Sequence, residues 1–79
     1  MVWQEGPAMK EYVVLFERAG ANYSAYVPDL PGCISTGATL DETEANIREA
    51  IELYLAAMAD DGLPAPEPLT QARGVRVSA

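Results

Sequence analysis

The residues best suited to chemistry are a single cysteine, Cys33, and twelve acids, because the sequence contains no histidine. A Ser-His-Asp type of triad therefore lacks its usual base. Cys33 has no basic neighbour in the sequence that would lower the pKa of its thiol, so we expect a buried structural thiol. One cysteine also cannot build a zinc site, which needs about four ligands. These residues predict no catalytic residue, no metal and no cofactor.

Asp29 is the acid with the most unusual surroundings, because it lies between two prolines in the run Pro28-Asp29-Leu30-Pro31-Gly32. An Asx-type turn, in which the carboxylate bonds to nearby backbone, is the favoured interpretation. A catalytic or metal-binding role is the weaker alternative. Gly32 and Gly37 do not form a phosphate-binding loop, since neither lies in a strand-to-helix pattern that includes a lysine.

Acidic residues are concentrated between positions 41 and 61. The stretch has seven acids and only Arg48 as a base, and its side-chain charge of −6 is most of the net −7 of the chain. The acids are Asp41, Glu42, Glu44, Glu49, Glu52, Asp60 and Asp61. This charge disfavours nucleic acid as a partner, because such binding relies on neutralised phosphates. The acids are either a solvated face, which the sequence alone favours, or a docking surface for a basic protein.

The same stretch has the pattern of an amphipathic helix over residues 40–61. Thr39 is a good N-cap and, with Glu42, predicts a capping box. Gly62 and Pro64 predict the end of the helix. The apolar positions Leu40, Ile47, Ile51, Tyr54 and Met58 form one stripe, which we expect to pack on a sheet. Asp41, Arg48, Glu49 and Glu52 fall on the opposite side.

Four short segments have the composition of strands. Residues 11–17, 23–27 and 33–36 are rich in β-branched and aromatic side chains, and Gly20 and Asn22 predict a hairpin between the first two. Tyr12, Val14 and Phe16 would share one face of the first strand. Residues 63–68 contain three prolines and predict an extended tether. Residues 75–77 alternate in character and predict a short edge strand.

With 79 residues, the chain is long enough for one domain, which we place at 9–79 after a flexible extension over 1–8. A core this small usually gives no more than about 3–5 kcal/mol of stability, so support from another chain is expected. We predict a homo-oligomer, most simply a symmetric dimer. A lone cysteine and the lack of any secretory or membrane-spanning segment favour the cytoplasm.

Several motifs together resemble the HicB-like antitoxin family. The run from Tyr26 to Cys33 is similar to the family's signature loop. The stretch Gly37-Ala38-Thr39-Leu40 is similar to the junction between strand and helix in the family. Residues 48–54 are similar to the body of its helix, and the whole resemblance extends over about residues 9–68. The motif positions expected to have structural roles are Pro28, Pro31, Gly32, Cys33, Gly37 and Thr39.

This resemblance implies an α+β fold of order β-β-β-α-β, a partial ribonuclease-H-like arrangement with one helix on a small antiparallel sheet. It implies no nuclease activity, and it implies a partner that is a small basic HicA-like messenger-RNA interferase. The expected partner-binding residues are Asp29, Leu30, Asp41, Glu42, Glu49 and Glu52. The alternative is an oligomeric HicB-like domain with another protein partner or ligand and no toxin.

The sequence departs from the family pattern at two places. Thr43 and Glu44 stand where the family more often has small and apolar residues, so we expect altered packing in the first helical turn. Many family members continue into a DNA-binding segment, and the sequence printed here has no room for one after Val77. We therefore expect no direct DNA binding by this chain.

Overall fold

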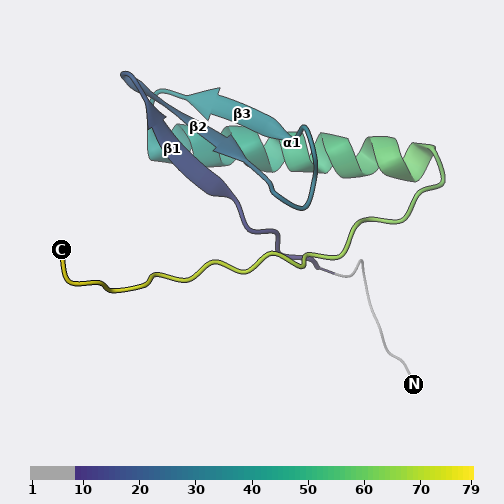
Figure 1. Ribbon diagram of the computed structural model, residues 1–79. Helices are drawn as coiled ribbons and strands as arrows, with labels where there is room; N and C mark the ends of the chain where they lie inside the picture. The colour runs from purple at the N-terminus through teal and green to yellow at the C-terminus, as the bar shows by residue number, and fades with distance from the viewer. Residues whose placement is uncertain (1–8) are drawn as a thin grey trace.

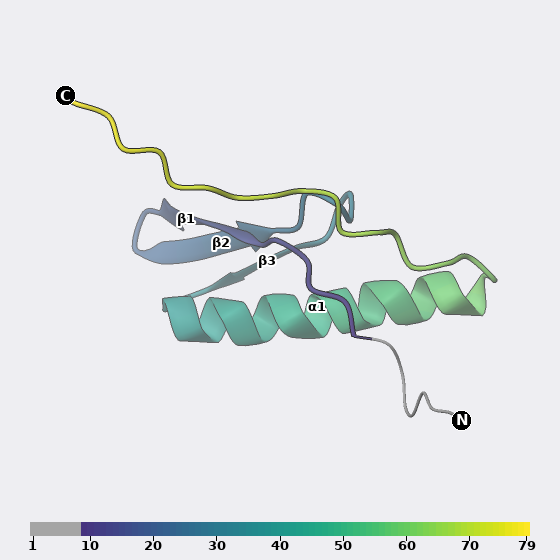
Figure 2. The same cartoon turned by 90° about the horizontal axis from the view of Figure 1, so that it is seen from below.

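A computed structural model describes residues 9–79, so the extension expected at residues 1–8 lies outside the described part. Three strands are followed by one helix: β1 (Leu15–Ala19), β2 (Asn22–Tyr26), β3 (Ile34–Gly37) and α1 (Leu40–Asp60). The strands form one antiparallel sheet in the order β1-β2-β3, and α1 crosses one of its faces (Figures 1 and 2). The predicted α+β class and the helix on the sheet are confirmed.

The hairpin between β1 and β2 forms through a two-residue turn. Ala19 pairs with Asn22, and Gly20 has a φ of +65°, the positive value that a type II′ turn needs at its first central position. β1 begins four residues later than predicted. Its first residue, Leu15, pairs with Tyr26, the last residue of β2. After Tyr26 the chain leaves the sheet and enters the loop over residues 27–33. Residues 11–14 therefore have no strand beside them with which to pair.

The junction between β3 and α1 is a very close approach of two backbones. A Cβ atom on Gly37 would lie 2.6 Å from the Thr43 hydroxyl oxygen and 2.8 Å from the Thr43 backbone nitrogen. Only glycine leaves enough space here. Thr43 is fully buried, and its hydroxyl donates to the Thr39 carbonyl over 2.6 Å. Thr43, which departs from the family pattern, therefore lies at the closest contact of the junction, and its hydroxyl has a hydrogen-bond partner in the Thr39 carbonyl.

Helix α1 begins and ends as its sequence predicts, to within one residue. The Thr39 hydroxyl accepts from the Glu42 backbone N–H over 3.0 Å. The Glu42 carboxylate accepts from the Ala38 N–H over 2.9 Å, one residue before the position that a capping box would use. At the other end Gly62 has a φ of +74°, and the Leu63 N–H donates to the Met58 carbonyl, which closes the last turn.

The core lies between the sheet, the loop over residues 27–33 and the middle of α1. Its buried side chains are Ala25, Val27, Leu30, Cys33 and Ile47. Tyr12, Val14, Phe16, Ala50, Ile51, Tyr54 and Leu55 pack around them but stay partly exposed. The predicted face of Tyr12, Val14 and Phe16 does turn to the core. Leu40, however, is 49% exposed, because it opens the helix at the edge of the sheet, and Thr43 takes the buried place instead.

The segment after the helix is extended and lies beside the start of the chain. Lys10 Nζ lies 3.1 Å from the Glu67 carboxylate, and the Tyr12 hydroxyl donates to the Pro66 carbonyl over 2.6 Å. Beyond Thr70 the chain runs apart from the sheet and the helix (Figure 1). The edge strand predicted at residues 75–77 is not formed within this chain, so that prediction is wrong for the isolated chain. A strand needs a partner, and none of residues 9–70 lies alongside it.

Candidate docking surface

The loop over residues 27–33 is a closed, rigid connection between β2 and β3. The Val27 N–H donates to the Cys33 carbonyl over 3.1 Å, and the Leu30 N–H donates back to Val27 over 3.0 Å. Gly32 has a φ of +82°, a conformation that favours glycine. Leu30 points into the core and has no exposed surface. Its predicted contact with a partner is therefore incompatible with this structure, since a partner cannot reach it.

Two long-range contacts attach this loop to the rest of the chain. The Tyr54 hydroxyl donates to the Pro31 carbonyl over 3.0 Å and fixes the loop to the helix. Both carboxylate oxygens of Asp29 accept from Thr70, from its N–H over 3.0 Å and from its hydroxyl over 2.9 Å. The predicted Asx-type turn at Asp29 is thus replaced by a bond to a segment 41 residues away. Asp29 thus attaches the loop over residues 27–33 to the segment that follows the helix.

Cys33 closes the loop and lies in the core with 4% of its surface exposed. Burial raises the pKa of its thiol above the ordinary value, because the apolar surroundings disfavour the thiolate. The thiolate is the reactive form of cysteine. The residue therefore contributes to packing and is poorly suited to nucleophilic chemistry, in agreement with the expected structural thiol.

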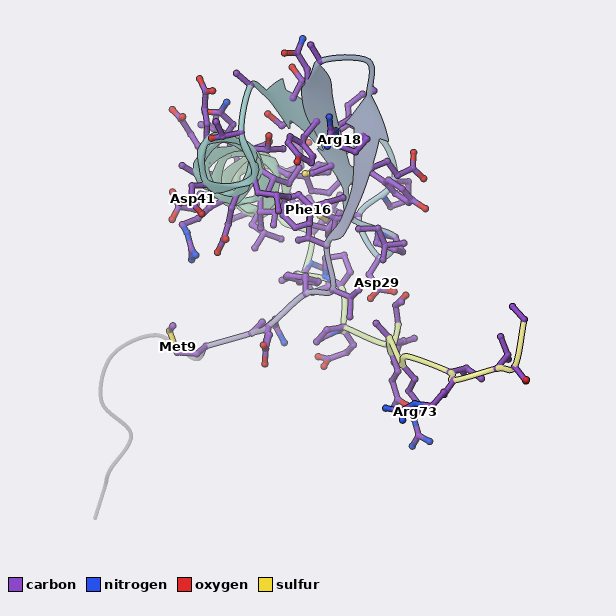
Figure 3. All side chains as sticks on the ribbon, turned by 90° about the vertical axis from the view of Figure 1, so that its left-hand side faces the viewer. Met9, Phe16, Arg18, Asp29, Asp41 and Arg73 are labelled. Atoms are coloured by element: carbon purple, nitrogen blue, oxygen red, sulfur yellow. The ribbon has the colours of Figure 1, made fainter. Side chains whose placement is uncertain are left out.

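The acids expected to meet a partner gather on the outer side of α1. We call Asp41, Glu42, Glu49 and Glu52 the acidic face, and all four are exposed. They lie opposite the helix side that carries Ile47. In Figure 3, Phe16 lies between the sheet and the helix, whereas Asp41 lies on the outer side of the helix. Glu42 also caps the helix, so its carboxylate has a structural task.

One apolar residue interrupts this face, and the sequence pattern did not single it out. Leu53 follows Glu49 by one helical turn and Glu52 directly, and it is 65% exposed. The sequence does contain a signal for Leu53, because this leucine lies outside the apolar stripe of the helix. A leucine at such a position does not face the core and is left exposed. An exposed leucine among carboxylates offers a contact that a partner can desolvate.

A groove runs along the other flank of α1, between the helix and the segment that leads into β1. It is open, with a volume of about 980 Å³. Its floor is apolar, formed by Tyr12, Val14, Phe16, Ile51 and Leu55, with Met9 and Ala65 at its margins. Charged side chains complete its rim, namely Lys10, Glu11, Glu44, Arg48 and Glu52. Arg48 lies 3.5 Å from Glu44, and both side chains are well exposed, so this pair adds little stability.

Within residues 9–79, no three cysteine or acidic side chains approach one another closely enough to hold a metal ion. Over the same residues, α1 is not apolar enough along its length to span a bilayer. The described surface thus offers two features for recognition, the acidic face and the groove.

Comparison with known proteins decides the family. A model described as the HicB-like antitoxin of bacterial toxin-antitoxin systems matches residues 12–75. The chain belongs to the HicB-like antitoxin family. This family domain covers all three strands, the helix and most of the extended segment.

The relatives include proteins of a phage, of bacteria and of archaea. A UPF0150 protein of Synechocystis is 42% identical over 57 residues, which cover 71% of this chain and 72% of that protein. A UPF0150 protein of Helicobacter pylori is 45% identical over 49 residues, or 62% of this chain and 68% of that protein. An uncharacterised 14.9 kDa protein of Haemophilus phage HP1 is 39% identical over 62 residues. That alignment covers 76% of this chain but only 47% of the phage protein. No solved structure matches the chain.

Proposed function

We propose that this HicB-like domain neutralises a small basic HicA-like messenger-RNA interferase by binding it through the acidic face of α1. The observation that carries the proposal is the exposed group of acids on the helix side away from the core, with Leu53 among them. The family supplies the antitoxin role. The choice of toxin and surface is our inference.

The acidic face and Leu53 would contribute in different ways. Exposed carboxylates attract a basic protein over a distance and speed the encounter, but each exposed ion pair adds only about 0–1 kcal/mol at equilibrium. A leucine that becomes fully buried in the interface contributes more, about 1.5–3 kcal/mol. We therefore infer that the acids set the association rate and that Leu53 slows dissociation.

The remaining expectations complete the proposal. The chain acts by binding and not by catalysis, it works in the cytoplasm, and it does not bind DNA by itself. It is also a homo-oligomer, most simply a symmetric dimer, because the core is small and several of its apolar side chains stay partly exposed.

The direct test is an RNA-cleavage assay with the small basic protein encoded beside this one. Adding an equal amount of this chain should abolish cleavage. Leu53→Asp should weaken the inhibition by roughly tenfold or more, since it places a charge in the interface. Leu63→Asp is the matched control, because Leu63 is also exposed but lies beyond the helix. Full inhibition by Leu53→Asp would move the docking surface elsewhere.

The alternative is an oligomeric HicB-like domain that serves another protein partner or ligand. It would be favoured if the neighbouring gene encodes no basic ribonuclease, or if the chain leaves such a ribonuclease fully active.

A further inference from the structure

The last nine residues differ from the rest of the chain in both structure and charge. Residues 71–79, which we call the C-terminal arm, are extended and exposed throughout. Val75 is 79% exposed and Val77 is 73% exposed. The arm carries Arg73 and Arg76 and no acid, whereas residues 9–70 carry eleven acids and three bases. A basic arm with two valines on one side of an extended strand is thus attached to a strongly acidic domain.

The domain has a matching place for such an arm. β1 is an edge strand, and in the described chain no backbone lies beside its outer edge. That edge leads into the groove, where Val14, Phe16, Ile51 and Leu55 are only partly covered. The rim of the groove carries Glu11, Glu44 and Glu52. In an extended strand added here, Arg73, Val75 and Val77 would face the groove, with the valines on its floor and Arg73 near these carboxylates. Arg76 would face the other side of the sheet.

The opposite edge of the sheet is less suitable. β3 leads directly into α1, and the Asn46 side chain donates to the Thr36 carbonyl over 2.8 Å. The helix therefore already occupies a hydrogen-bonding position on β3. This leaves the β1 edge as the available site for strand addition in the described part of the molecule.

The arm does not reach the groove of its own chain. Asp29 holds Thr70 through both carboxylate oxygens, which fixes the direction in which the arm leaves the domain. In Figure 3, Arg73 lies on the side opposite Met9, which borders the groove. The arm therefore points away from its own groove and is presented to another molecule.

We propose that the C-terminal arm of one copy docks along β1 and into the groove of a second copy, and that two copies exchange arms reciprocally. Nine extended residues span about 30 Å, which is ample for pairing with the five residues of β1. The exchange satisfies the free edge of β1 and covers the apolar floor of each groove. It also supplies the strand that residues 75–77 fail to form alone. This mode of assembly does not depend on any toxin.

The first test is the mass of the chain in solution. Val75→Asp with Val77→Asp should convert a dimer to a monomer at equal concentration in sedimentation velocity. The dimer dissociation constant should rise by roughly a hundredfold or more, because both valines lose a buried site. Since both side chains are exposed in the single chain, the helical signal in far-ultraviolet circular dichroism should be kept, with only the small strand signal of the docked arm lost. Leu63→Asp is the control and should leave the dimer intact.

The second test locates the arm by disulfide formation between two differently tagged chains. One chain carries Val77→Cys, and the other carries a cysteine at Glu11, Glu44 or Glu52 on the groove rim. The control cysteines replace Asp41, Glu49 or Asp60, exposed acids that do not line the groove. The native Cys33 is buried and stays in place. Mixed disulfides should form with at least one rim cysteine and much less with the controls.

Three results would overturn the proposal. They are a monomeric wild-type chain, a dimer that survives Val75→Asp with Val77→Asp, and equal cross-linking of rim and control cysteines. A monomeric wild-type chain would also contradict the homo-oligomer proposed above. None of the three results bears on toxin neutralisation, which is tested separately.

Discussion

The two sides of α1 illustrate two different uses of the same helix. The inner side is enclosed: Ile47 is 2% exposed, and Thr43 lies against Gly37 so closely that no Cβ fits between them. The outer side carries the acidic face and the exposed Leu53. Short-range packing fixes the inner side, and long-range charge characterises the outer side. Changes on the inner side should therefore alter stability, and changes on the outer side should alter recognition.

The largest effect on stability is expected at Ile47. Ile47→Ala should lower the free energy of unfolding by about 2–5 kcal/mol, because it removes buried methylene groups and leaves a cavity. Urea unfolding followed by circular dichroism measures the change. Leu53→Ala on the outer side should change it by no more than about 0.5 kcal/mol. Similar losses for the two variants would mean that the helix sides are wrongly assigned.

A smaller loss is expected at the junction of β3 and α1. Gly37→Ala should cost about 1–3 kcal/mol, because the new Cβ meets the Thr43 hydroxyl and backbone at 2.6–3.0 Å. Adding Thr43→Ala should recover only part of the loss, since the backbone contacts remain. Gly74→Ala meets nothing within 4 Å and serves as the control. The thermal midpoints of the three variants provide the comparison.

The smallest stability effect concerns the attachment of the C-terminal segment. Asp29→Asn weakens the bonds to Thr70 and should cost about 1 kcal/mol, because the site is only partly buried. Amide hydrogen exchange at Thr70 should become faster, whereas exchange in the middle of α1 should stay slow. Asp60→Asn, an exposed change at the helix end, should leave both rates as they are. Unaltered exchange at Thr70 in Asp29→Asn would contradict the contact.

Local signals in the sequence predicted most of the fold. The cap at Thr39, the spacing of apolar residues to Met58 and the stop at Gly62 act within a few residues of one another, so the helix could be placed closely. The hairpin at Gly20 is local in the same way. The start of β1 was misplaced because it depends on where β2 ends, which is information from a different segment.

The features that the sequence did not predict all depend on distant contacts. Asp29 looked like a local turn residue, and only the folded chain brings Thr70 to it. Leu30 looked like a surface loop residue because prolines flank it, yet the loop folds inward and buries it. The strand expected at residues 75–77 has the right pattern but no partner within its own chain. Single-chain patterns identify a segment that can pair and do not identify the molecule with which it pairs.

The outer side of the helix is tested most directly by the rate at which the chain associates with the basic protein encoded beside it. Glu49→Lys with Glu52→Lys changes the net charge by the same amount as Asp60→Lys with Asp61→Lys, which lies at the far end of α1. At low salt the first pair should lower the association rate about tenfold or more, and the second pair much less. The difference should shrink toward physiological salt, where the screening length is about 8 Å. If both pairs match the wild-type rate at low salt while the proteins stay folded, the acidic face is only a solvated surface and the docking proposal is wrong.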